Sequence, residues 1–158
     1  MSVKVTVDNT TALKKTLKDL ANTRVLVGVP SATAGREDGP INNAAIGYVH
    51  EFGLPEKNIP ARPFLVPGVK NARAGIVARL RQAGRAALDG NQKLLQKALM
   101  AAGLETVSKI QAKITEGPFA PLADSTLDAR RRRGVTRTKP LIDTGRLRAA
   151  ITYVIRKK

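Results

Sequence analysis

The stretch NIPARPFLVPG, residues 58–68, carries three prolines, at positions 60, 63 and 67, with one arginine and one phenylalanine between them. Each proline fixes the backbone angle φ and removes an amide donor. We therefore expect residues 58–68 to be stiff and extended, and to form neither a helix nor a central strand. The helical patterns before and after this segment are then separate elements.

Two strand patterns and one helical pattern lie on the N-terminal side. Residues 3–7 (VKVTV) alternate apolar and polar side chains with period two, which predicts a strand with one buried face. Residues 24–29 (RVLVGV) form an almost continuous apolar run, which predicts a strand covered on both faces. Between them, leucines recur at helical spacing from Leu13 to Leu20 and predict a short amphipathic helix that ends near Asn22.

The segment just before the prolines shows a loop and a helix. Residues 31–40 (SATAGREDGP) have two glycines and no periodicity, and we expect them to form a mobile loop. Residues 41–53 (INNAAIGYVHEFG) predict one short helix closed by Gly53, because glycine is the usual residue just past a helix end.

Long helical patterns follow the prolines. Apolar residues step by three or four from Val69 to Ala87, with lysine and arginine largely outside that stripe, and Gly90 is expected to break or kink the helix. A second stretch recurs from Leu95 to Ile114 and stops at Gly117. These patterns predict two long central helices.

The C-terminal part returns to short elements. Ser125 is expected to cap a short basic helix, TLDARRRRG, and residues 149–155 alternate again, which predicts a closing strand. Because strands open and close the chain around a helical middle, we predict an α+β fold. It would have a mostly antiparallel sheet of about four strands packed with helices, in one domain over residues 1–158.

Charge is concentrated near the C-terminus. The formal net charge is +16, and residues 130–158 contain eleven Lys or Arg and one acid, which gives +10 of that total. Such a cationic region favours polyanions, of which DNA and RNA are the obvious examples. A solvated, solubilising surface is the alternative.

The sequence offers little for catalysis or for cofactors. Cysteine is absent, the acids are scattered, and the single histidine, His50, is followed by Glu51, whose side chain points about 100° away on a helix. No serine has a base nearby and no glycine-rich phosphate fingerprint occurs. We therefore expect no enzyme activity, cofactor or metal. Without an apolar run of about 18 residues, we also expect no membrane span and a soluble protein made in a cytoplasm.

Two stretches resemble a known group of proteins. AAIGYVHEFGLPEKNIPARPFLVPGV, residues 44–69, resembles the signature of phage virion morphogenesis and tail-completion proteins, the group that includes the Mu gpG-like and HK97 gp10-like families. GPFAPLADSTLDARRRRG and KPLIDTGRLRAAITYVI, within residues 117–155, resemble the closing pattern of the same group. One departure is Ala123-Asp124, where members often carry Ser-Pro.

The resemblance implies a structural virion protein at the head–tail junction. Such a protein assembles as a homo-oligomeric ring, with six copies by the implied symmetry, contacts neck, connector and tail-tube proteins, and surrounds the DNA channel. It is made in the host cytoplasm and ends in the virion. A tail terminator that caps the tail tube is the alternative within this class, and a free, non-specific DNA-binding protein is the alternative outside it.

Three groups of site residues follow. With Phe64 as an apolar anchor and Arg62 as a polar fork, the expected subunit interface comprises His50, Glu51, Phe52, Ile59, Pro60, Arg62, Pro63 and Phe64. The alternative is that this segment lies across its own core, with Phe64 buried and Arg62 bonded to local carbonyls. Expected contacts with DNA in the channel or with a partner are Arg130, Arg131, Arg132, Arg133, Arg137, Lys139, Arg146 and Arg148. A structural turn is expected at Asp143, Thr144 and Gly145.

Overall fold

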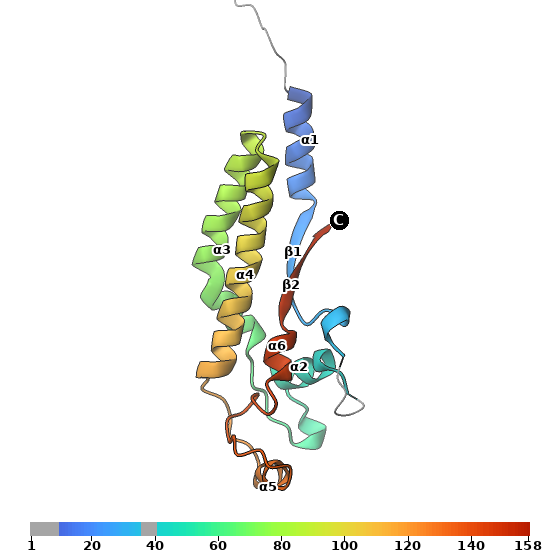
Figure 1. Ribbon diagram of the computed structural model, residues 1–158, viewed down its shortest axis with the longest axis vertical. Helices are drawn as coiled ribbons and strands as arrows, with labels where there is room; N and C mark the ends of the chain where they lie inside the picture. Colours follow the sequence, from blue (N-terminus) through green and yellow to red (C-terminus); the bar gives the residue numbers. More distant parts are fainter. Residues whose placement is uncertain (1–9, 36–40) are drawn as a thin grey trace, which may run out of the picture.

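A computed structural model describes residues 10–35 and 41–158 (Figure 1). Of these residues, 63% are helical. In chain order the elements are α1 (Thr10–Ala21), β1 (Thr23–Gly28), the 3-10 turn η1 (Ser31–Thr33), α2 (Asn43–Phe52), η2 (Pro55–Lys57), α3 (Leu65–Leu88), α4 (Gln92–Glu116), α5 (Asp124–Arg132), α6 (Arg146–Ala150) and β2 (Thr152–Lys157). None of the described helices is both long and apolar enough to span a membrane.

The antiparallel hairpin of α3 and α4 forms the long axis of the molecule (Figure 1). Near the turn, the buried alanines 83, 86 and 87 of α3 pack on Leu95 and Leu99 of α4. At the other end, a side chain at Gly68 would come within 2.6 Å of the Cα of Ile110, so only glycine permits this close crossing. The helices therefore approach each other through small residues.

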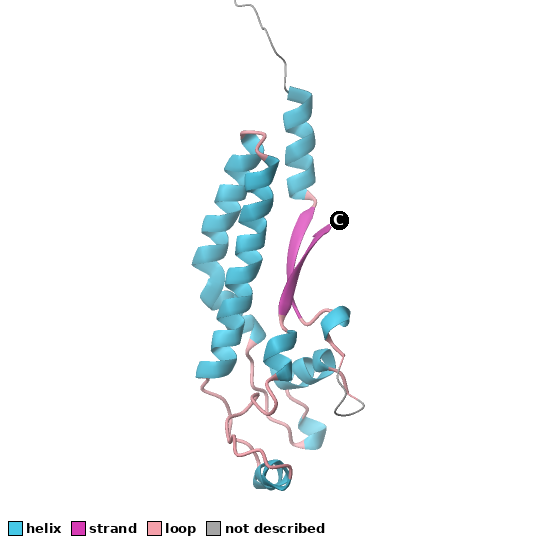
Figure 2. Ribbon diagram, in the orientation of Figure 1, coloured by secondary structure: helices cyan, strands magenta, loops and turns pink. Residues whose placement is uncertain are grey.

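The two strands form one antiparallel pair beside the hairpin (Figure 2). Their register places Val25 opposite Ile155 and Val27 opposite Tyr153. Both strands pack on α4, and the ring of Tyr153 occupies the space where a side chain at position 103 would lie, which explains the glycine there. This sheet forms one face of the core.

The expected α+β fold with a four-stranded sheet is wrong, because the described residues are mostly helical and contain one two-stranded sheet. The long helices bury much of their small-residue surface against each other, so a broad sheet is not needed to cover them. The strand pattern at residues 3–7 lies outside the described residues. Residues 149–150 belong to α6, which the alternation concealed.

Several local expectations also needed correction. The strand pattern at residues 24–29 predicted two covered faces, but Arg24 and Leu26 are exposed. The proline segment is extended only to Phe64, because Pro67 lies in the first turn of α3, where backbone amides need no helical partner. Ser125 does not cap α5, whose N-cap is Ala123.

Other expectations are confirmed. The amphipathic helix, the two long helices and the helix before the prolines all form close to their predicted bounds. Gly53 follows α2 with φ of 78°, Gly90 separates α3 from α4 with φ of 67°, and Gly145 has φ of 85° at the start of α6. Of the expected loop at residues 31–40, residues 31–33 form η1, and residues 36–40 lie outside the described part.

Candidate functional site

The carboxylate of Glu51 caps a helix that belongs to a different part of the chain. Its Oε2 atom accepts hydrogen bonds from the backbone amides of Phe64 and Leu65, both at 2.8 Å, and Oε1 accepts one from Val66 at 2.9 Å. No side chain at the N-cap position supplies this bond. A buried carboxylate here satisfies the free amides of α3 and faces the positive end of its dipole.

The guanidinium of Arg62 ties the proline segment to the loop that follows α4. Its Nε donates to the carbonyl of Ala120 at 2.7 Å, and its Nη2 donates to that of Pro121 at 2.6 Å. The backbone amide of Arg62 donates to the carbonyl of His50 at 2.6 Å. Arg62 is buried, and burial together with the charge of Arg130 lowers its pKa. The side chain is therefore used inside its own subunit.

Phe64 belongs to a buried core cluster near the start of α3. It is buried among residues of α4, α6 and the preceding loop, including Ile110, Ile114 and Leu147. The structure thus places both the expected anchor and the expected fork inside the chain, in the arrangement in which the segment lies across its own core.

A second buried arginine organises the basic C-terminal region. The side chain of Arg130 is 6% exposed, and its Nη1 donates to the carbonyls of Arg137, Lys139 and Ile142 at 2.8, 3.0 and 3.2 Å. Its Nε lies 3.7 Å from Oδ1 of Asp143. Arg130 therefore holds the loop between α5 and α6 in place.

Two further arginines of this region also bond to Asp143. Nη2 of Arg133 is 2.9 Å from its Oδ2, and Nη1 of Arg137 donates to its backbone carbonyl at 3.0 Å. Arg131 pairs with Asp128 at 2.8 Å, at the surface. The expected cationic arm is in part an internal network around one carboxylate.

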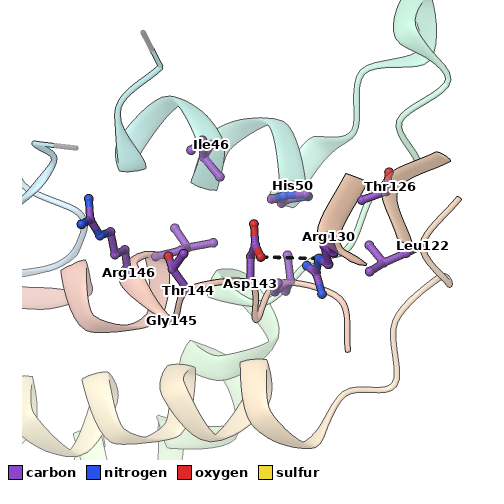
Figure 3. A pocket seen from close by; sticks show the side chains of 11 residues that line it. Ile46, His50, Leu122, Thr126, Arg130, Asp143, Thr144, Gly145 and Arg146 are labelled. Carbon is purple, nitrogen blue, oxygen red and sulfur yellow. Dashed lines mark ion pairs between the residues drawn. The ribbon is translucent and has the colours of Figure 1, made fainter. Parts of the chain in front are cut away.

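A pocket of about 280 Å³ lies between α2, α5 and the turn before α6 (Figure 3). His50 and Asp143 lie on opposite walls, and each has one buried side-chain atom without a hydrogen-bond partner, Nδ1 and Oδ1 respectively. Burial, and then the charges of Arg62 and Arg130, lower the pKa of His50 from 6.5 to about 4. The imidazole is therefore neutral at pH 7.

This pocket offers two buried hydrogen-bonding atoms, Nδ1 of His50 and Oδ1 of Asp143, that have no hydrogen-bond partner. Neither side chain forms a hydrogen bond to a hydroxyl that could act as a nucleophile, as a triad requires. Within the described residues, no group of three His, Cys, Asp or Glu is placed to hold a metal ion. The pocket can accept a polar group, and Arg146 lines its edge.

The remaining expected interface residues lie near or at the surface. Phe52 is 63% exposed. Its ring centroid lies 4.8 Å from that of Tyr48, which is 67% exposed and was not among the expected interface residues. Pro60 and Pro63 are exposed, and Ile59 is half-buried and bridges to Leu54. The two rings are tilted by 49°, and a contacting aromatic pair on the outside is unusual for a chain with five aromatic residues.

The other expected contacts divide by location. Arg132, Lys139 and Arg148 are exposed, and Arg146 is half-buried. Of the expected turn, Asp143 anchors the arginine network, Thr144 is exposed, and Gly145 takes the positive φ that begins α6. Sequence reasoning missed the role of Glu51 as a helix cap and the exposure of Tyr48. A Glu fourteen residues before a helix start carries no signal, but Tyr48 and Phe52 are four residues apart on a predicted helix.

Comparison with known proteins gives little further guidance. No family model matches the chain. A segment of 32 residues is 53% identical to part of the uncharacterized protein MJ0331 of Methanocaldococcus jannaschii. The matched segment makes up 20% of this chain and 24% of that protein. No solved structure matches. The match with MJ0331 thus spans about a quarter of the length of that protein.

Proposed function

We propose that the chain is a structural subunit of a phage virion that forms a ring at the head–tail junction, joins the tail to the capsid and surrounds the DNA channel. One observation carries the proposal. The two stretches that resemble tail-completion proteins, residues 44–69 and 117–155, are joined by the buried bonds from Arg62 to Ala120 and Pro121. The resembling residues thus belong to one structural unit, which supports the proposal.

The surface of this unit suits contacts between subunits. A closed ring needs a rigid patch on each subunit that fits a different patch on the next. The proline segment is held by Arg62 and by Glu51, so little conformational entropy remains to be lost when a neighbour binds. The exposed pair Tyr48 and Phe52 lies on α2, the helix that precedes it, and aromatic side chains are common anchors of interfaces.

The exposed cations support contact with DNA in a channel. Arg131, Arg132 and Lys139 are exposed on α5 and the following loop, whereas Arg130 is used internally. Contacts of arginine and lysine with phosphates are insensitive to sequence. Because such contacts are non-specific and exchange readily, a genome can pass through the ring without stalling.

A free, non-specific DNA-binding protein is the second candidate, and the net charge of +16 favours it. Sedimentation velocity of the purified protein at low and high salt, with and without duplex DNA, separates the two. The ring proposal expects a discrete oligomer without DNA, or assembly on tail tubes. A monomer that binds DNA in a strongly salt-dependent way would instead favour the second candidate.

The place in the particle needs a separate test. Removing this reading frame from the phage that encodes it should leave filled heads and separate tails, visible by electron microscopy. Complementation with the intact chain should restore joined particles. Particles that stay joined without the chain would contradict a role at the junction, and tails of uncontrolled length would favour the tail-terminator alternative.

A further inference from the structure

An apolar groove of about 490 Å³ lies between the sheet and the helical hairpin. It is separate from the pocket of His50 and Asp143. Four elements, α1, β1, α3 and α4, contribute to its walls. Its lining residues include Leu20, Val25, Val27, Val69, Ile76 and Leu80.

The groove borders a strand with an unused edge. In the described residues β1 pairs with β2 alone, so its other edge has no strand partner. Val25 and Val27 of β1 line the groove, as do Val69 and Leu80 of α3, which are 37% and 45% exposed. The hairpin thus extends beyond the two-stranded sheet, and a further strand beside β1 would cover α3.

Residues 3–7 have the pattern and the length for that position. The valines at 3, 5 and 7 share one face of a strand, and Lys4 and Thr6 share the other. Four residue steps of a strand span about 13 Å. The groove residues of α3, from Val69 to Leu80, span eleven helical steps, about 17 Å. Three valines therefore match the apolar wall in length.

The same chain cannot place this strand fully in its own groove. Helix α1 separates Thr10 from the start of β1 at Thr23 by roughly 18 Å along its axis. Three residue steps from Thr10 to Val7 cover at most about 10 Å. Three residue steps are therefore too few to bring Val7 of the same copy to β1, because α1 lies in line with β1 (Figure 1).

We propose that residues 3–7 of one copy add a third strand to the free edge of β1 in a second copy, with the three valines in the groove. The contact joins different surfaces of the two copies, so it can repeat around an axis and close into a ring. The inference rests on the assembly of copies in the proposed function and identifies the contact that links them.

Cysteine cross-linking tests the contact directly, because the chain has no cysteine of its own. Val5 is the middle valine and Ile76 lies in the middle part of the α3 wall, so the pair is close whichever way the strand runs. Val5→Cys protein is co-refolded with ¹⁵N-labelled Ile76→Cys protein and oxidised mildly. Mass spectrometry should find the mixed dimer, and the matched pair of Lys4→Cys with Ile76→Cys should not form it.

The double variant Val5→Cys/Ile76→Cys completes the test. A disulfide within one chain would overturn the inference, and so would the absence of any Val5–Ile76 disulfide in variants whose circular dichroism matches the unmodified protein. Deleting residues 1–9 should convert the oligomer to monomer with unchanged helix content. A ring that persists after the deletion refutes the strand contact and leaves the proposed function standing, whereas an intact chain that is always monomeric refutes ring assembly itself.

Discussion

Glu51 and Phe64 are thirteen residues apart, yet the carboxylate of the first accepts the backbone amide of the second at 2.8 Å. Between them the chain turns back through η2 and the prolines. The end of α2 and the start of α3 are thereby fixed to each other.

Glu51→Ala should lower the free energy of unfolding by about 2–4 kcal/mol, because three amides of α3 lose their charged acceptor in a buried place. Urea denaturation followed by circular dichroism measures the change. Glu56→Ala, at an exposed glutamate of η2, should change it by less than about 0.5 kcal/mol. Equal effects of the two substitutions would contradict the capping role.

Arg130→Met and Arg132→Met should distinguish the structural role of Arg130 from the surface charge of Arg132. The first removes the donor to three carbonyls and should cost about 2–5 kcal/mol of stability, whereas the second should cost less than about 0.5 kcal/mol. Arg132→Met should instead lower the salt dependence of DNA binding. Full stability of Arg130→Met would show that the network around Asp143 is not needed for the fold.

His50 should make stability depend on pH. Its pKa is 6.5 when unfolded and about 4 in the fold, so below pH 6.5 the unfolded chain takes up a proton that the folded chain does not. The free energy of unfolding therefore decreases as the pH is lowered from about 6.5 to 4. At pH 5 it should be about 2 kcal/mol lower than at pH 7.5. His50→Gln should lose this share of the pH dependence in urea titrations, and identical pH profiles would contradict the burial of a neutral imidazole.

Gly68→Ala and Gly84→Ala should have opposite effects. Both glycines lie in α3, but a Cβ at 68 would meet the backbone of Ile110, whereas one at 84 meets nothing within 4 Å. We expect Gly68→Ala to destabilise the protein by about 1–3 kcal/mol. Gly84→Ala should stabilise it by up to about 1 kcal/mol, through helix propensity. Thermal melts compare the two, and destabilisation by both would show that α3 is crowded throughout.

Phe52→Ser should weaken assembly without weakening the fold. The ring is exposed against Tyr48, and truncating an interface anchor costs about 2 kcal/mol or more of binding. Sedimentation equilibrium gives the association constant and urea denaturation gives the stability. Leu104→Ser, at another exposed apolar residue, is the matched control, and an equal loss of assembly there would remove any special role for Phe52.

The sequence by itself determined the local features of this protein. Helical periodicity located α3 and α4, glycines 53 and 90 marked the ends of helices, and the alternation near the C-terminus located β2. These features depend on neighbours in the chain, and a repeat of apolar residues reports which face of an element is buried.

The tertiary structure alone decided what covers each buried face. Periodicity could not show that the two long helices would pack mainly on each other. The expected number of strands in the sheet was therefore too high. The distribution of charge along the chain also could not show that Arg62 and Arg130 bind carbonyls inside the subunit. The carbonyls bound by Arg62 lie 58 and 59 residues further along the chain. Those bound by Arg130 lie in the loop after α5. The sequence pattern around an arginine is the same whether its side chain faces solvent or a buried loop. Only the positions of its hydrogen-bond acceptors in the folded chain distinguish the two cases.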